Sequence, residues 1–511
     1  MKLTLLPTLG ALALAASLAS GASSAQTRCQ YATIAALPLS YSGPGLEMTT
    51  VGSINGKPAV MLVDTGAVSV MLTEHGARRH KLALTSTSRT LSAVGGEVPV
   101  YKTVVNEVSI GASRAGKTSL QVIGEMGDPS VYDAAIGAPF LLQADLELFL
   151  ANKELRMFRA LDCSSDAFLA YWNPSASVVP FHWGFDGHLN PRFTVQINGK
   201  NASAMIDTGA NLTSISLSTA KRLGIHPDKA RIDRIEDARG WGKAPAARWR
   251  GAFKTFQVGQ ELIENAPIGI IDHDSGMAEV ILGTDFLRAY RVLLSMSQKK
   301  LYLSYVGGLP FSTGQMVEPW IEAEAQGGNT DAQMRLARAY GAGVGVAKDE
   351  GAANAWFERA ALAGNGHALL LTGRRLATEG QPKAAAQRLR AGLDKLPGLR
   401  DAALWLYIAR VRSGEAGLAK TELAASAPAD TLTLESLPLT GFYLGKFSAD
   451  EVIKEYSLPS VDEAARCYAS STLNEWYDAH GIAERPAGLA ALARQCTAGA
   501  DGAKPAAAAG P

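Results

Sequence analysis

The sequence predicts a multidomain protein in which two homologous, β-barrel-like all-β lobes precede an all-α domain of helical repeats. Three observations support this fold class. The chain has 511 residues, which exceeds the size at which a single hydrophobic core stops growing. The motif Asp-Thr-Gly-Ala occurs twice, in closely matched surroundings. After Gly307-Gly308-Leu309-Pro310 the composition changes from β-rich to Ala, Leu and Arg at helical spacing.

Composition and charge narrow the class of function. Hydrophobic residues make up 47% and charged residues 19% of the chain, as in soluble globular proteins. The formal net charge is +1, and no long run of Lys or Arg occurs. Electrostatics therefore gives no reason to expect nucleic acid or an anionic membrane as a partner.

The N-terminus has the layout of a cleaved secretory signal. Lys2 is followed by an apolar segment from Leu3 to Ala19 and then by small residues that end at Ala25. A membrane anchor is the alternative, but the segment is short and Ala-rich. We predict that residues 1–25 are removed, that the mature protein starts near Gln26, and that no membrane contact remains afterwards.

The four cysteines favour disulfides in an exported chain. Their grouping suggests that Cys29 pairs with Cys163 and Cys467 with Cys496. Two other pairings are formally possible, and buried, unpaired thiols are the remaining alternative.

The internal duplication defines the two lobes, predicted over residues 26–165 and 166–310. Between Ile54–Ala67 and Ile197–Ala210, nine of fourteen positions are identical without a gap. Each copy contains an Asn-Gly pair between two apolar runs, which predicts a β-hairpin because both turn residues tolerate positive φ. Asp207 thus falls on Asp64, which suggests that the two carboxylates work as a pair.

Two aspartates at equivalent places of duplicated lobes can face each other across a pseudo-twofold axis. Carboxyl groups about 3 Å apart cannot both ionise, so they share one proton and supply an acid and a base together. The glycines after each Asp-Thr allow a tight turn beneath the carboxylate, and the threonine hydroxyls can form hydrogen bonds across the axis. These supporting residues are Thr65, Gly66, Thr208 and Gly209.

Three further features recur in both copies. A short basic segment, Ala77–Arg79 or Ala220–Arg222, is predicted to be helical and solvated. A glycine-bearing loop then follows, which is either a mobile flap or an ordinary surface hairpin. An apolar-apolar-Gly motif comes later and ends at Gly137 or Gly283. The candidate flap residues are Gly95, Gly96, Tyr101 and Trp241.

The β-rich part of the chain resembles an aspartic protease of the retropepsin-like and pepsin-like clan, because both Asp-Thr-Gly triplets and both apolar-apolar-Gly motifs match that clan. Ala after the triplet is the retroviral-type variant, whereas two lobes in one chain are the pepsin-type arrangement. The resemblance implies a dyad of Asp64 and Asp207 that activates water without metal or cofactor, and an extended peptide or protein substrate under a flap. Similar signal-bearing fusions among bacteria imply a periplasmic or secreted protein.

Other functions remain open at this point. The lobes could bind peptides without cleaving them, and the helical repeats would then serve as a scaffold. A glycosidase-type carboxylate pair is a different enzymatic alternative. Asp272-His273-Asp274 could be metal ligands, but no further His or Cys has matching spacing, and a polar turn is the better interpretation.

The helical domain is predicted over residues 319–497, followed by a disordered tail at 498–511. The segment from Ala332 to Gly364 resembles one unit of the Sel-type group of tetratricopeptide-like repeats, and Ala332 recurs as Ala368. Stacked helical hairpins of this kind expose surfaces suited to proteins or peptides, so a protein partner is expected there.

Overall fold

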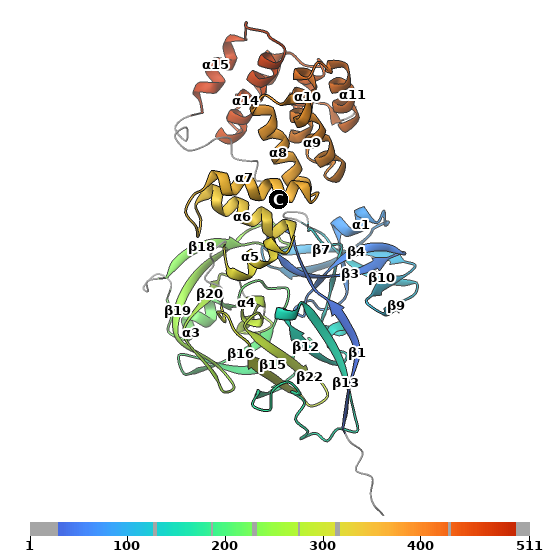
Figure 1. Cartoon of the computed structure of the whole chain (residues 1–511), viewed down its shortest axis with the longest axis vertical. Coiled ribbons are helices and arrows are strands. Elements are labelled where there is room, and N and C mark those ends of the chain that lie inside the picture. Colours follow the sequence, from blue (N-terminus) through green and yellow to red (C-terminus); the bar gives the residue numbers. More distant parts are fainter. Residues whose placement is uncertain are drawn as a thin grey trace, which may run out of the picture.

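The computed structural model of this chain describes residues 29–125, 130–184, 188–226, 232–273, 276–311, 317–427 and 431–496. The predicted signal segment and the predicted tail lie outside these ranges. In the described part, two β-rich lobes lie side by side and a helical region stands on one end of them (Figure 1). This confirms the predicted fold class of two β lobes followed by helices.

The first lobe is built around a 10-stranded sheet, counted over the described residues. Its strand β11 runs parallel to β4, so that Ile136 lies opposite Val63, the last residue before Asp64. The elements of this lobe are β2 Ser40–Ser42, β3 Glu47–Ile54, β4 Lys57–Val63, β5 Met71–Thr73, α1 Glu74–Arg79, β6 Thr85–Ala93, β7 Gly96–Val105, β8 Val108–Ile110, β9 Ser113–Ala115, β10 Thr118–Ile123, β11 Ala134–Ile136 and α2 Ala138–Leu141.

The second lobe repeats this arrangement within a 13-stranded sheet, again counted over the described residues. Strand β21 runs parallel to β16, so that Leu282 lies opposite Ile206, the last residue before Asp207. The elements are β14 Ser177–His182, β15 Arg192–Ile197, β16 Lys200–Ile206, β17 Ser214–Ser216, α3 Leu217–Arg222, β18 Asp233–Ala238, β19 Ala246–Val258, β20 Glu261–Ile271, β21 Val280–Leu282, α4 Thr284–Leu287, β22 Tyr290–Ser295 and β23 Lys300–Tyr305.

The two predicted hairpins are confirmed. Strands β3 and β4 pair through Asn55-Gly56, and β15 and β16 pair through Asn198-Gly199. All four turn residues have positive φ, between 50° and 76°. Turns of this kind match the right-handed twist of the flanking strands, which is why Asn-Gly is such a strong hairpin signal.

The basic segments form the predicted helices α1 and α3, and their last arginines also form ion pairs. Arg79 Nη1 lies 2.8 Å from Asp133 Oδ2, and Arg222 Nη2 lies 2.6 Å from Glu279 Oε1. The same two carboxylates accept hydrogen bonds of 2.8 and 2.9 Å from backbone N–H groups in β4 and β16. Both arginines are exposed, as expected, and each also helps to hold the strand that leads to an aspartate.

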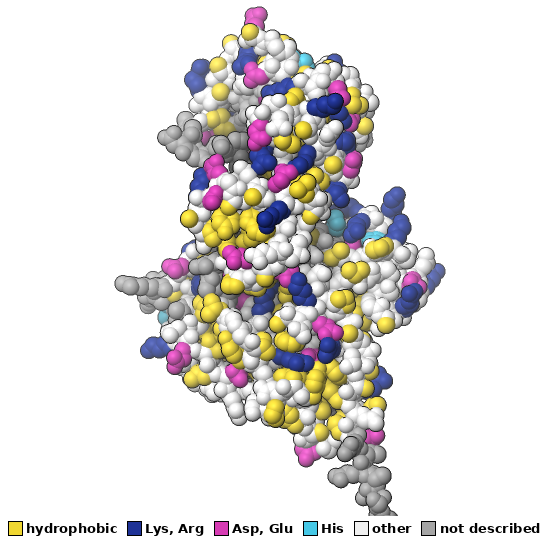
Figure 2. Space-filling view, viewed as in Figure 1, with side chains coloured by type: hydrophobic (Ala, Val, Ile, Leu, Met, Phe, Trp, Pro, Cys, Tyr) yellow, Lys and Arg dark blue, Asp and Glu magenta, His cyan; other side chains and the backbone are white. Residues whose placement is uncertain are grey.

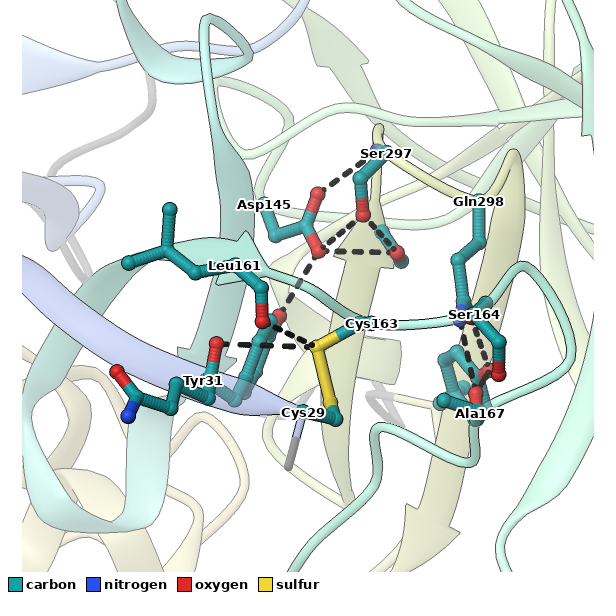
Figure 3. The surroundings of a disulfide bond; sticks show 12 residues. Cys29, Tyr31, Asp145, Leu161, Cys163, Ser164, Ala167, Ser297 and Gln298 are labelled. Carbon is teal, nitrogen blue, oxygen red and sulfur yellow. Dashed lines mark hydrogen bonds between the residues drawn. A yellow bond between two sulfur atoms is a disulfide. The ribbon is translucent and has the colours of Figure 1, made fainter. Parts of the chain in front are cut away.

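An inter-lobe sheet joins the lobes. Strands β1 Gln30–Pro38, β13 Glu154–Leu161 and β12 Asp145–Phe149 continue into β22 of the second lobe, and the short helix η1 Leu150–Asn152 links β12 to β13. Asp145 is buried at this junction and accepts hydrogen bonds from Tyr31, Ser295 and Ser297 (Figure 3). These hydrogen bonds join an acidic residue of the first lobe to two serines of the second lobe.

Both predicted disulfides are present. Cys29 bonds to Cys163 and ties the beginning of β1 to the end of β13, close to Asp145 (Figure 3). Cys467 bonds to Cys496, and no cysteine of the described residues is free. The grouping of the cysteines along the sequence was thus sufficient to choose the correct pairing.

The helical region follows the β lobes. From α5 to α11, and again from α12 to α15, each helix packs against the next. Asn329 and Asn365 cap the N-termini of α6 and α8, which are matching places of the predicted repeat. Assignment to a named repeat class remains a prediction. The helices are α5 Pro319–Gln326, α6 Thr330–Ala342, α7 Glu350–Leu362, α8 Gly366–Thr378, α9 Pro382–Lys395, α10 Arg400–Arg412, α11 Ala416–Ser426, α12 Pro438–Tyr443, α13 Ala449–Tyr456, α14 Glu463–Ala479 and α15 Ala487–Arg494.

The first two of these helices share the hydrophobic core of the β lobes. Buried side chains of Ile321 and Leu336 belong to the same apolar cluster as the strands. Arg288 of the second lobe stacks on Trp320, with its guanidinium carbon 3.6 Å from the ring centroid. The carboxylate of Asp331 accepts a 2.8 Å hydrogen bond from the Gly43 N–H of the first lobe. Helices α5 and α6 therefore pack against the β lobes and share their hydrophobic core.

The visible surface carries charges of both signs, intermixed over lobes and helices (Figure 2). This distribution agrees with the net charge of +1. Within the described ranges, no helix combines the length and the apolar character that crossing a membrane requires.

Candidate active site

The two aspartates occupy equivalent places directly after β4 and β16. The Asp64 N–H donates to Ile136 O at 3.1 Å, and the Asp207 N–H donates to Leu282 O at 3.0 Å. The parallel strands β11 and β21 thus hold the backbone of each aspartate. The duplication seen in the sequence is therefore a duplication of the site's supports.

A reciprocal set of four hydrogen bonds locks the two turns together. The Thr65 hydroxyl donates to Ile206 O at 2.8 Å and accepts from the Thr208 N–H at 3.1 Å. The Thr208 hydroxyl donates to Val63 O at 2.7 Å and accepts from the Thr65 N–H at 2.9 Å. Both threonines are fully buried. Residues 143 positions apart in sequence are thereby fixed across the pseudo-twofold axis.

The glycines of the two turns allow the carboxyl groups to approach. A Cβ atom added to Gly66 would lie 2.6 Å from Asp207 Oδ2, and one added to Gly209 would lie 2.5 Å from Asp64 Cγ. Each glycine thus packs directly against the opposite aspartate. The two carboxyl groups are in hydrogen-bond contact with each other. Any larger residue at either glycine would push the pair apart.

Backbone N–H groups orient each carboxylate. Asp64 Oδ1 accepts from the N–H groups of Gly66 and Ala67 at 2.9 and 3.1 Å. Asp207 Oδ1 accepts from the Gly209 N–H at 2.9 Å. Such turns hold an aspartate side chain in one rotamer.

Gly137 and Gly283 buttress the turns from behind. A Cβ atom at Gly137 would overlap the carbonyl oxygens of Ala67 and Ser69, and one at Gly283 would lie 2.7 Å from Ala210 O. The next residue in each copy completes the contact, because the Ala138 N–H donates to Ala67 O and the Thr284 N–H to Ala210 O. The predicted supporting glycines therefore lie where the duplication suggested.

The environment makes the pair hold a proton. Burial raises the pKa of Asp64 well above its ordinary value, and the negative charge of Asp207 and the hydrogen bond to it raise the pKa further. Burial also raises the pKa of Asp207, but hydrogen bonds from Gly209 and from the Asp64 side chain offset part of that rise. The pair therefore keeps a shared proton to higher pH than an ordinary carboxyl group would. The titration belongs to the pair.

The two glycine-bearing loops are hydrogen-bonded to each other. The Gly242 N–H donates to Val94 O and the Ala244 N–H to Gly95 O, both at 3.0 Å. Gly95 and Gly96 have φ of 93° and 117°, which favours glycine at both positions. The loops after β6 and β18 therefore form a joint roof that spans both lobes.

Trp241 anchors this roof in the first lobe. Its ring packs against a buried apolar cluster that includes Ala67 and Val98, and its Nε1–H donates to the Tyr132 hydroxyl at 3.2 Å. Tyr101, the other aromatic flap candidate, lies instead on β7, pairs with Val122 and packs against the core of its lobe. The structure thus brings Gly95, Gly96 and Trp241 together and leaves Tyr101 outside the group.

Asn190 is a site residue that no sequence pattern indicated. This buried residue donates through Nδ2 to Thr65 O and to Ile206 O, both at 2.7 Å, and so bridges the turns of the two lobes. The register of the duplication puts Asn190 at the place of Glu47 in the first copy. Because the two residue types differ, the repeat itself did not reveal the role.

A cavity of about 300 Å³ lies beside the turn of Asp64. Its lining comes from both lobes and includes Gly66, Val68, Pro139, Leu189, Asn190 and Met277.

The described residues contain no group of three or more His, Cys, Asp or Glu side chains that could hold a metal ion. Of the Asp272-His273-Asp274 turn considered above, Asp274 lies outside the described residues.

Both lobes are similar to a family of known proteins. Residues 50–141 and 193–289 match a family model described as gag-polyprotein putative aspartyl protease. Each matched segment contains one Asp-Thr-Gly-Ala motif and one supporting glycine. A search among curated proteins returned no match. The β-rich part of the chain is therefore similar, in both of its lobes, to the putative aspartyl proteases of gag polyproteins, which supports a protease function in general.

Proposed function

We propose that this protein is an aspartic endopeptidase that hydrolyses peptide bonds with a water molecule activated by Asp64 and Asp207. The observation that carries the proposal is the mutual contact of these two buried carboxyl groups, held by the reciprocal hydrogen bonds of Thr65 and Thr208. Two carboxyl groups with raised pKa values that share one proton can act as an acid and a base in the same step.

The reaction follows from the charge state of the pair. A water molecule between the carboxyl groups gives a proton to ionised Asp207 as its oxygen attacks the carbonyl carbon of the peptide bond. Protonated Asp64 gives its proton to the carbonyl oxygen, and a tetrahedral diol forms. Asp207 then gives the proton it received to the peptide nitrogen, and the C–N bond breaks. A hydroxyl of the diol returns its proton to Asp64 as the carboxylic acid and the amine leave. The pair ends with one proton, as it began.

The roof made by residues 94–96 and 240–244 supports this chemistry. An extended peptide under it would be shielded from bulk water, which strengthens every electrostatic interaction with the developing charge. The roof must open to admit a peptide, because its two loops are hydrogen-bonded to each other. We propose that release of Trp241 from its apolar cluster accompanies this opening.

The test uses the mature chain and a mixed peptide library. We expect cleavage that a statine-type inhibitor abolishes. Asp64→Asn and Asp207→Asn should each reduce kcat/KM by at least about 1,000-fold, since an amide preserves shape but cannot share the proton. Asp162→Asn is the matched control, because Asp162 is exposed and lies in a positive-φ position that Asn tolerates.

Binding of the inhibitor without cleavage of any peptide would instead favour the alternative of a peptide-binding module without turnover. Cleavage that resists the inhibitor and persists in both Asn variants would contradict the proposal outright.

We also propose that the helices beyond α6 recruit a protein partner or a protein substrate and contribute no catalytic residue. Removing them should lower kcat/KM for casein more than for a short peptide. Equal effects on both substrates would contradict this role. The two disulfides fit an oxidising compartment, so we propose a periplasmic or secreted protein.

A further inference from the structure

The cavity beside Asp64 is lined by a buried polar side chain, that of Asn190, which can bind a ligand. Asn190 is only 3% exposed, and it lines this cavity of about 300 Å³. Both atoms that receive its Nδ2 hydrogens are carbonyl oxygens, of Thr65 and Ile206. Carbonyls can only accept, so the amide nitrogen must face them, and the orientation of the side chain is determined.

The position of the amide oxygen of Asn190, Oδ1, is thereby determined as well. Asn190 Oδ1 is buried and has no hydrogen-bond partner among the residues that the structure describes. A buried acceptor without a donor is costly, and a substrate that supplied the donor would remove that cost. The donor must reach the floor of the cavity, because Asn190 is far more buried than the rim residues Val68 and Leu189, which are 40% and 49% exposed.

The residues that line the cavity determine which kind of side chain it can accommodate. Val68, Pro139, Leu189 and Met277 present apolar surface and His188 adds an imidazole, while no Asp or Glu is among the residues that line it in the described part of the chain. A cation at the floor would be buried without a counter-charge, which is unfavourable. A large side chain with an apolar body and an uncharged donor at its tip satisfies both the walls and Asn190.

The duplication offers an internal comparison. In the other half of the cleft the register puts Glu47 at the place of Asn190 and Asn211 at the place of Val68. A Cβ atom on Gly45 would meet both of these side chains, so they fill the space there. Leu46, which matches the half-exposed Leu189, is fully buried. The two halves of the cleft therefore differ in shape and polarity.

We propose that this cavity is a specificity subsite of the peptidase that takes a tyrosine side chain, or another large side chain with an uncharged terminal donor, and that Asn190 Oδ1 accepts the hydrogen bond from its tip. The inference rests on the proposed function and deepens it. Because the described residues at the matching places differ between the two halves of the cleft, the preference applies on one side of the cleaved bond.

The test compares peptide pairs that differ only by Tyr and Phe at one position. The pairs cover each position on both sides of the cleaved bond, and the full mature chain is used. At one position we expect kcat/KM to be at least about tenfold higher for Tyr, because Phe leaves Asn190 Oδ1 unpaired. At the matching position across the bond the ratio should be near one.

Variants separate specificity from a structural role. Asn190→Ala should reduce the Tyr-to-Phe ratio to near one, whatever it does to overall activity through the lost bridge between the turns. Val68→Trp, at the exposed rim, should slow peptides with either aromatic residue at that position and spare peptides with Ala there. Glu47→Gln is the matched control at the equivalent place and should leave the ratio unchanged.

Several results would overturn the subsite while the proposed function stands. The first is cleavage by the wild-type chain with a Tyr-to-Phe ratio of kcat/KM below about threefold at every position. The second is a ratio that stays unchanged in Asn190→Ala. The third is a ratio that Glu47→Gln abolishes as well. If no peptide of any sequence is cleaved, the proposed function fails, and this inference fails with it.

Discussion

The hydrogen-bonded lock between Thr65 and Thr208 can be tested by removing one hydroxyl at a time. Thr65→Val keeps the shape of the side chain but loses two buried hydrogen bonds, the donation to Ile206 O and the acceptance from the Thr208 N–H. Ile206 O keeps the hydrogen bond from Asn190 Nδ2, so the Thr208 N–H is the group left buried without a partner. A buried group left unsatisfied costs about 1 to 3 kcal/mol, and we expect a loss of that size.

Thr208→Val should have a similar effect, because it removes the symmetric pair of bonds to Val63 O and the Thr65 N–H. The unfolding midpoint in urea measures this loss. With a slope of about 1 to 3 kcal/mol per molar urea, the midpoint should fall by about 1 M in each variant. Peptidase activity should fall by about 100-fold, because a shift of about 1 Å in reacting groups has that effect.

Thr90→Val is the matched control, since Thr90 is exposed on β6 and the same substitution there removes no buried hydrogen bond. Its urea midpoint and activity should match those of the wild type. If Thr65→Val and Thr208→Val behaved like this control, the reciprocal hydrogen bonds would not hold the two aspartates in place, and the geometric argument for the site would be refuted.

Three further predictions concern the surroundings of the pair. Gly209→Ala puts a Cβ atom 2.5 Å from Asp64 Cγ, so kcat/KM should fall by at least about 100-fold with an unchanged circular dichroism spectrum, whereas Gly417→Ala, which meets open space, should have no effect. A chain ending at residue 346 should keep its peptidase activity, whereas one ending at 317 should aggregate on expression, because it loses the parts of α5 and α6 that share the core. Burial raises the pKa of Glu47 from its ordinary value of 4.5 to about 7, so ionisation of this group destabilises the fold as the pH rises from 4.5 to 7. Glu47→Gln should therefore raise the free energy of unfolding by up to about 3 kcal/mol at pH 8 and leave it unchanged at pH 4. Equal effects of Glu47→Gln at both pH values would show that the carboxyl is not kept protonated by burial.

The sequence was most informative where the duplication repeats the same residue types. Asp64 and Asp207, with their threonines and glycines, stood at matching places, and a gapless repeat requires equivalent positions in the two lobes. The Asn-Gly hairpins were equally clear, because few other residue pairs adopt positive φ twice in succession. Local chemistry and the repeat gave the same answer at these positions.

The sequence was least informative where the two copies differ or where contacts cross between distant segments. Asn190 bridges the turns only because the fold brings it to Thr65, and the first copy has Glu47 in its place. Arg79 lies at an exposed helix end, as predicted, but its ion pair with Asp133 was not predictable because Asp133 lies far along the chain. Nothing in the composition of α5 indicated that its buried face would join the β core.

The pH dependence of kcat/KM for the mature chain tests the central claim most directly. Burial raises the pKa values of both aspartates, and the neighbouring carboxyl raises that of Asp64 further. The residues after the two glycines, Ala67 and Ala210, offer no hydroxyl to stabilise the charged forms. Raised pKa values shift both the step that adds a second proton and the step that removes the shared one to higher pH. We therefore predict a bell-shaped profile with its maximum between mildly acidic and near-neutral pH, and no such profile in Asp64→Asn or Asp207→Asn. A maximum below about pH 4, where unperturbed carboxyl groups titrate, or near-full activity in either Asn variant, would contradict the account.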